Sequence, residues 1–187
     1  AKTKENFDHY KLATKNRISV LQKMSNYDAA ESVISEYIAL LNSHFGSSRE
    51  SQILDFLKIK QELALIYRQN KNCVKALVIY EELRNVYIKH YKSTISYADF
   101  LVEYALCYKE AGQRMEYVAL LNDAIFEYCS IEDQTILVKK NAATAYLHLA
   151  LAISVDGDYE EAFKSYEQSI SLLNKVYRTQ PISVVGY

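Results

Sequence analysis

The segment GDYEEAFKSYEQSISLL, residues 157–173, decides the fold, because three other segments of the chain repeat its pattern. The related segments begin at Ser25, Lys71 and Gly112, each directly after a polar break. The sixth position of the pattern holds, in chain order, Ala30, Ala76, Tyr117 and Ala162. Successive units are therefore 46, 41 and 45 residues apart. A spacing this regular predicts a repeated structural unit.

A second amphipathic stretch precedes each of these segments. In the second unit, Leu63, Ala64 and Tyr67 recur at the spacing of one helix face. The four stretches are YKLATKNRISVLQKM, FLKIKQELALIYRQN, FLVEYALCYKEA and KKNAATAYLHLALAISV. We therefore expect one domain over residues 1–187 that repeats a helix, a turn and a second helix four times, over residues 9–43, 49–90, 95–130 and 133–178.

The units resemble the tetratricopeptide repeat, which has a large–small pair and a tyrosine on its first helix, a glycine at the turn, and an alanine and an aromatic on its second helix. The fourth unit matches this pattern with Leu149, Ala150, Ile153, Gly157, Tyr159, Ala162, Tyr166 and Ser169. The resemblance implies an all-α fold, a right-handed α-solenoid of about four antiparallel helix pairs.

The units are longer than the usual repeat of about 34 residues. They resemble the repeats of kinesin light chains, and HFGSSRES (44–51) stands at the position of that family's interhelical loop. The paired asparagines typical of that family before the large–small pair are not present here; in the second unit Gln61 and Glu62 stand in their places. We therefore transfer the architecture and not the cargo-adaptor function.

The repeat pattern gives the residues of the fourth unit separate structural roles. Gly157 ends the first helix, Tyr159 is expected to fill a wedge below the turn, and Ala162 is small where the two helices approach closely. Tyr166 and Ser169 are expected to meet the next layer of helices. The tail, residues 179–187, contains PISVVGY (181–187), which would cap the last unit, lie in the groove or start a further helix.

Composition excludes several classes of function. Twenty-two basic and 23 acidic residues give a net charge of −1, which does not favour nucleic-acid binding. No apolar run reaches the roughly 20 residues of a membrane-spanning helix. Cys73, Cys107 and Cys129 are odd in number and lack CxxC spacing, which indicates free thiols and a cytoplasmic location.

The sequence contains no recognisable catalytic or metal-binding pattern. His9, His44, His90 and His148 are far apart and none lies in an HxxxH or HExxH motif. The four glycines cannot build a phosphate-binding loop. We therefore expect no enzymatic activity and no cofactor.

A solenoid of helix pairs has a concave groove lined by the first helix of each pair. The candidate binding residues in this groove are Lys15, Ser19, Gln22, Lys58, Gln61, Leu65, Arg68, Val102, Leu106, Lys109, Leu147, His148 and Leu151. Ser19, Leu65, Leu106 and Leu151 occupy the same place in successive units and form, with nearby valine and leucine, an apolar row suited to a peptide or a helix. The alternative is that these leucines pack under neighbouring helices or the tail.

A chaperone carboxylate clamp does not fit this groove. Lys15 has a suitable place for such a clamp, but Ser19, Glu62 and Asp99 stand where its other residues belong. The main hypothesis is a scaffold or adaptor that binds a protein or peptide partner in the groove. The alternatives are a peptide-sensing regulatory domain of a larger protein and an architectural module that self-associates.

Overall fold

The computed structural model describes residues 2–44 and 50–179, and the chain is helical over most of these ranges. Its helices are α1 (Lys2–Lys23), α2 (Tyr27–His44), α3 (Glu50–Gln69), α4 (Cys73–Tyr91), α5 (Ile95–Glu110), α6 (Arg114–Ser130), α7 (Ile136–Val155) and α8 (Tyr159–Thr179). No strand occurs in these ranges. The all-α helix-pair architecture predicted from the sequence is confirmed. The expected interhelical loop and the PISVVGY tail lie largely outside the described residues.

The turn inside each helix pair has one residue in the left-handed region of backbone space, where a side chain is strained. These residues are Ser25, Lys71, Gly112 and Gly157, with φ of 55°, 60°, 75° and 84°. They are the residues at which the four repeat segments begin. The turn therefore keeps one geometry in all four units, although only two units place glycine there.

A backbone hydrogen bond of the same kind closes the turns of the first three units. The N–H of Asn26 donates to the Leu21 carbonyl at 2.9 Å, and the N–H of Asn72 donates to the Tyr67 carbonyl at 2.8 Å. Each bond spans five residues and satisfies a carbonyl that the helix end leaves without a partner. The side chains of Asn26 and Asn72 also accept a hydrogen bond from the first turn of the following helix.

Close approach of the paired helices explains the small sixth residue of the repeat. Ala30, Ala76 and Ala162 are buried, as the pattern predicts. The third unit has Tyr117 at this position, and its side chain is buried as well. A tyrosine needs much more room than an alanine, so the third unit must place this ring differently.

The chain divides into two compact units, with the boundary inside α4. Unit 1 spans Ala1–Leu83, and unit 2 spans Arg84–Tyr187. In unit 1, α2 packs on both α1 and α3. Its core contains Ile18, Ala30, Val33, Ile34, Tyr37, Leu41, Ile59, Leu63 and Ile66. Each large apolar side chain buried in such a core stabilises the fold by about 1.5–3 kcal/mol.

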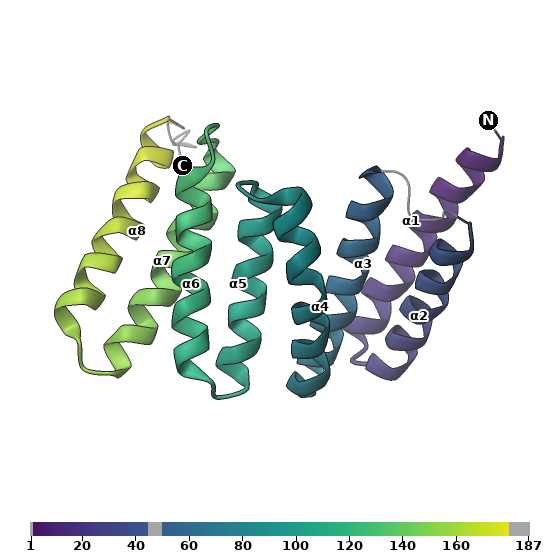
Figure 1. Ribbon diagram of the computed structural model, residues 1–187, viewed down its shortest axis with the longest axis horizontal. Helices are drawn as coiled ribbons and strands as arrows, with labels where there is room; N and C mark the ends of the chain where they lie inside the picture. The colour runs from purple at the N-terminus through teal and green to yellow at the C-terminus, as the bar shows by residue number, and fades with distance from the viewer. Residues whose placement is uncertain (1, 45–49, 180–187) are drawn as a thin grey trace, which may run out of the picture. The chain divides into compact units, whose positions relative to one another are not determined.

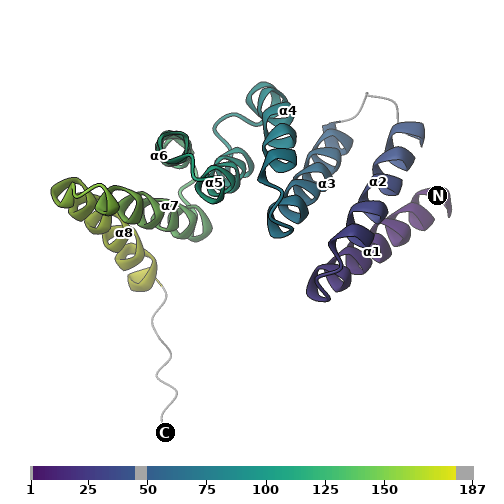
Figure 2. The ribbon, with the colours of Figure 1, turned by 90° about the horizontal axis from the view of Figure 1, so that it is seen from below.

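In unit 2, α6 packs on α5 and α7, and α7 pairs with α8. Figures 1 and 2 both show α7 beside α8. The rings of Tyr87 and Phe100 stack with their centroids 4.3 Å apart. Tyr128 Oη and Asn141 Nδ2 both donate to Asp99 Oδ1, at 2.5 and 2.8 Å. This shared carboxylate ties α5, α6 and α7 together.

Two of the expected roles in the fourth unit are wrong. Tyr159 does not fill a wedge, because its side chain is 72% exposed. Arg114 holds the same place in the third unit and reaches Asp156 in the turn of the following pair, whereas no described helix pair follows α8. Ser169 does not meet a further layer but donates its hydroxyl to the Ala143 carbonyl of its own helix pair, at 2.8 Å.

Candidate functional site

The predicted groove residues of unit 1 lie on α1 and α3. Lys15, Ser19 and Lys58 are exposed, and Leu65 is partly buried. Gln22, Gln61 and Arg68 are also partly buried. The amide Nε2 of Gln22 donates to Glu62 Oε1 at 2.7 Å, so this side chain links α1 to α3.

A second polar cluster in unit 1 joins three of its helices. Tyr67 Oη donates to Glu31 Oε1 at 2.5 Å, and the ammonium group of Lys75 lies 4.8 Å from the centre of the Tyr67 ring. Burial, together with the hydrogen bond to Glu31, raises the pKa of Tyr67 to about 12. The cluster is internally satisfied and holds α2, α3 and α4 together, so it is structural.

The predicted groove residues of unit 2 lie on α5 and α7. Leu147 and Leu151, one helical turn apart on α7, are 41% and 45% exposed. Lys109 is exposed, and Val102 and Leu106 are partly buried. Leu147 and Leu151 are therefore only partly covered by the described helices, whereas Leu65 and Leu106 are more deeply packed. The tail that the sequence offered as another cover lies outside the described residues.

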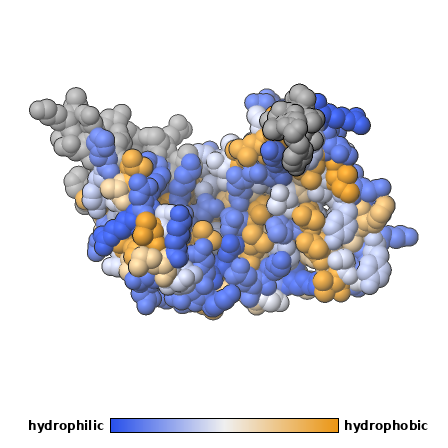
Figure 3. All heavy atoms as spheres, turned by 180° about the vertical axis from the view of Figure 1, so that it is seen from behind, coloured by the Kyte–Doolittle hydropathy of each residue, from blue (hydrophilic) through white to orange (hydrophobic). Residues whose placement is uncertain are grey.

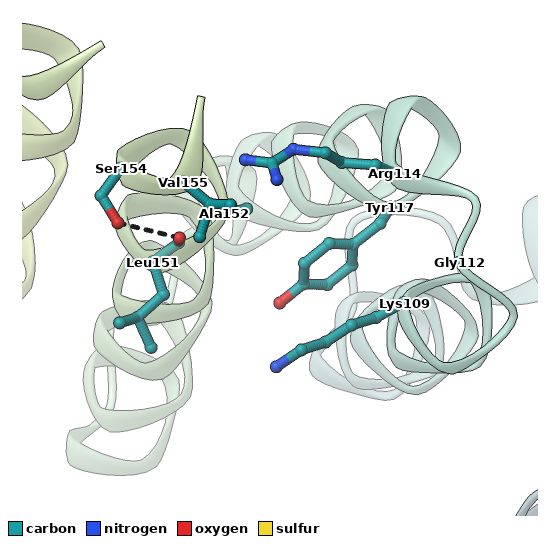
Figure 4. A pocket seen from close by; sticks show the side chains of 8 residues that line it. All are labelled: Lys109, Gly112, Arg114, Tyr117, Leu151, Ala152, Ser154 and Val155. Atoms are coloured by element: carbon teal, nitrogen blue, oxygen red, sulfur yellow. Dashed lines mark hydrogen bonds between the residues drawn. The ribbon is translucent and has the colours of Figure 1, made fainter. Parts of the chain in front are cut away.

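A pocket of about 510 Å³ opens beside these leucines, between the turn joining α5 to α6 and the end of α7. Its lining residues are Lys109, Gly112, Arg114, Tyr117, Leu151, Ala152, Ser154 and Val155. In Figure 4 the Tyr117 ring lies between Arg114 and Lys109, and its hydroxyl points toward the α7 side of the pocket. Of the residues predicted for the groove, Lys109 and Leu151 line this pocket and the others do not.

Tyr117 is the main element of the pocket that the sequence reasoning did not assign to the site. Its side chain is only 3% exposed, and its hydroxyl has no hydrogen-bond partner among the described residues. The ammonium group of Lys109 lies 5.7 Å from the centre of its ring. Burial raises the pKa of Tyr117, so the hydroxyl stays protonated and can donate a hydrogen bond.

The positive charges at the pocket come from Lys109 and Arg114. Arg114 Nη2 lies 2.9 Å from Asp156 Oδ2, an ion pair without hydrogen-bond geometry. The buried Nε of Arg114 has no hydrogen-bond partner among the described residues. Burial and the charge of Lys109 lower the pKa of His148 from its ordinary value of 6.5. The pocket thus favours an anion over a cation.

On the face drawn in Figure 3, patches of hydrophobic residues lie among hydrophilic ones. In the described residues, no group of three or more His, Cys, Asp or Glu side chains could hold a metal ion. Within residues 2–44 and 50–179, no helix combines the length and the hydrophobicity needed to cross a membrane.

The sequence of the chain matches the model of a known protein family. The family model for soluble NSF attachment protein (SNAP) matches residues 21–179, which is most of the chain. The chain belongs to the SNAP family. The SNAP match begins in α1 and ends at the last residue of α8, so it includes the pocket of unit 2.

Solved structures show the same repeat fold in other proteins. A Podosopora anserina protein described as a kinesin light chain with nearly identical TPR-like repeats is 17% identical over 90% of this SNAP-family chain and 96% of its own, with a TM-score of 0.55. A single-substitution variant of that protein has a TM-score of 0.56 and 17% identity, over 89% of this chain and 95% of its own. No curated protein sequence matches the chain significantly. The predicted likeness to long, kinesin-light-chain-like TPR repeats is confirmed for the fold.

Proposed function

We propose that the chain is a non-enzymatic interaction module that binds a segment of a protein partner on the α5–α7 face of unit 2. The observation that carries the proposal is the pair Leu147 and Leu151, both exposed and one turn apart, beside the pocket of Lys109 and Tyr117. Apolar side chains at this spacing suit an extended peptide or a helix laid along α7. The groove residues of unit 1 are proposed as a second contact surface.

The energetics of this surface agree with a binding role. Leu147 and Leu151 are each a little under half exposed, so covering one of them stabilises a complex by about 1 kcal/mol before the costs of association are subtracted. The polar groups of the pocket would fix the orientation of the bound segment, which an apolar surface alone does not do. The SNAP family is named for attachment to NSF, and such attachment would also be protein binding.

The test is a selection from a random peptide library displayed without free C-termini, with the full-length chain as bait. Wild type is compared with Leu147→Glu/Leu151→Glu, and the matched control is Val78→Glu, since Val78 is exposed on a helix outside the proposed face. We expect wild type and the control to enrich the same peptides and the double variant to lose them. Equal enrichment by all three proteins would contradict the proposal.

Self-association is a second candidate, favoured by α8. Phe163, Ile170 and Tyr177 are exposed at intervals of seven residues, and Tyr166 and Leu173 occupy the intervening positions three residues after Phe163 and Ile170. This is the a/d spacing of a coiled-coil seam. Sedimentation velocity over a range of concentrations tests it: an Ile170→Glu variant that dissociates a wild-type dimer would support self-association, and a wild-type monomer at every concentration would refute it.

A further inference from the structure

The pocket between α5, α6 and α7 gathers hydrogen-bond donors that the described part of the protein does not use. The Tyr117 hydroxyl and the Nε of Arg114 are buried and have no hydrogen-bond partner among the described residues. Lys109 adds a charged group at the same pocket. Leaving a buried donor unsatisfied is costly, and donors converging on one cavity indicate a site for an acceptor.

The net charge at the pocket limits what that acceptor can be. Lys109 and Arg114 carry one positive charge each, and the Asp156 carboxylate, paired with Arg114, offsets one of them. One positive charge therefore remains, which matches a singly charged carboxylate better than a doubly charged phosphate. The two oxygens of a carboxylate can accept from a tyrosine hydroxyl and a cation at once.

The apolar residues of the pocket indicate which kind of group lies next to the carboxylate in the ligand. Leu151, Ala152 and Val155 line the α7 side of the pocket, and Val155 is largely exposed. Leu147 continues this surface along α7. A ligand bound here therefore has an apolar group next to its carboxylate.

We propose that the pocket receives the side-chain carboxylate of an aspartate or glutamate within a partner segment, with an adjacent apolar residue of that segment packed on Leu151 and Val155. The assignment rests on the proposed function and adds the chemistry of the partner. The Tyr117 hydroxyl donates to the carboxylate, and Lys109 and Arg114 neutralise its charge. Tyr117 and Lys109 are thus specificity-determining residues.

The peptides enriched by the full-length wild-type chain test this directly. We expect them to share an acidic residue beside an apolar one. Replacing that acidic residue with its amide, Asp by Asn or Glu by Gln, should weaken binding by about tenfold or more, because a charge-assisted hydrogen bond is lost. Tyr117→Phe should cause a similar loss with the fold intact, whereas Tyr159→Phe, on the exposed start of α8, should change nothing.

Lysine variants give a second readout. Lys109→Ala should weaken the acidic peptide several-fold and reduce the salt dependence of binding. Lys140→Ala is the matched control, because Lys140 is exposed on α7 outside the pocket lining. The amide peptide should bind wild type and Lys109→Ala equally.

The outcomes separate this inference from the proposed function. Enriched peptides that depend on Leu147 and Leu151 but show no acidic preference would overturn the pocket assignment and leave the interaction module standing. A requirement for a phosphorylated residue or for a free C-terminal carboxylate would also overturn it. If wild type enriches no peptide, the proposed function fails and the pocket assignment fails with it.

Discussion

Two buried tyrosines on α6 should respond in opposite ways to loss of their hydroxyl groups. Tyr117 and Tyr128 are 3% and 2% exposed. The Tyr128 hydroxyl donates to Asp99 at 2.5 Å, whereas the Tyr117 hydroxyl has no partner among the described residues. A tyrosine-to-phenylalanine change removes one oxygen and leaves the ring, so the two variants compare the hydroxyl groups alone.

The expected magnitudes follow from these contacts. Tyr128→Phe removes a hydrogen bond to a carboxylate and should lower the free energy of unfolding by about 1.5–3 kcal/mol. Tyr117→Phe removes an unsatisfied buried hydroxyl and should leave the free energy of unfolding unchanged or raise it by up to about 1 kcal/mol. For a chain of this size, each kcal/mol corresponds to a shift in melting temperature of about 2–4 °C.

Chemical denaturation followed by circular dichroism measures both variants, with Tyr159→Phe as an exposed control expected to change stability by less than about 0.5 kcal/mol. If the two compact units unfold in separate transitions, the transition that contains α6 is the one to compare. If Tyr117→Phe destabilises the protein as much as Tyr128→Phe does, the Tyr117 hydroxyl has a structural partner and is not held ready for a ligand.

Other predictions concern the turn, a helix-pair contact and pH. Gly157→Ala should destabilise unit 2 by about 1 kcal/mol in thermal unfolding, because the added Cβ meets no neighbour but is strained at a φ of 84°. Ser169→Ala should cost about 1 kcal/mol in the same assay, because it removes the hydrogen bond to Ala143. The lowered pKa of His148, due to burial and Lys109, means that the unfolded state takes up its proton first, so stability should fall as the pH drops through 6.5. A His148→Gln variant should lose that part of the pH dependence when unfolding is compared on either side of this pH.

The repeat pattern was sufficient to predict the helix pairs and their turns. The four segments align at Ser25, Lys71, Gly112 and Gly157, and these residues share one left-handed backbone conformation. The pattern could not show that Tyr159 would be exposed, because its burial depends on a following helix pair and not on its own sequence.

The site was only partly predictable. Spacing along α5 and α7 made Lys109 and Leu151 candidate groove residues, and both line the pocket, whereas the other candidates on these helices do not. Tyr117 was visible as the one large residue at a position otherwise held by alanine, and that exception was the signal for the pocket. Sequence alone could not predict that its hydroxyl would lack a partner, since that depends on side chains from three helices.

The most direct test of the account is the affinity of one selected peptide for wild type, Leu151→Glu and Val78→Glu, measured by isothermal titration calorimetry on the full-length chain. The account predicts that Leu151→Glu weakens binding by at least about tenfold, because the change removes an apolar contact and places a charge under the bound segment. Val78→Glu should bind as wild type does. Equal affinity for Leu151→Glu and wild type would contradict the assignment of the binding site to the α5–α7 face.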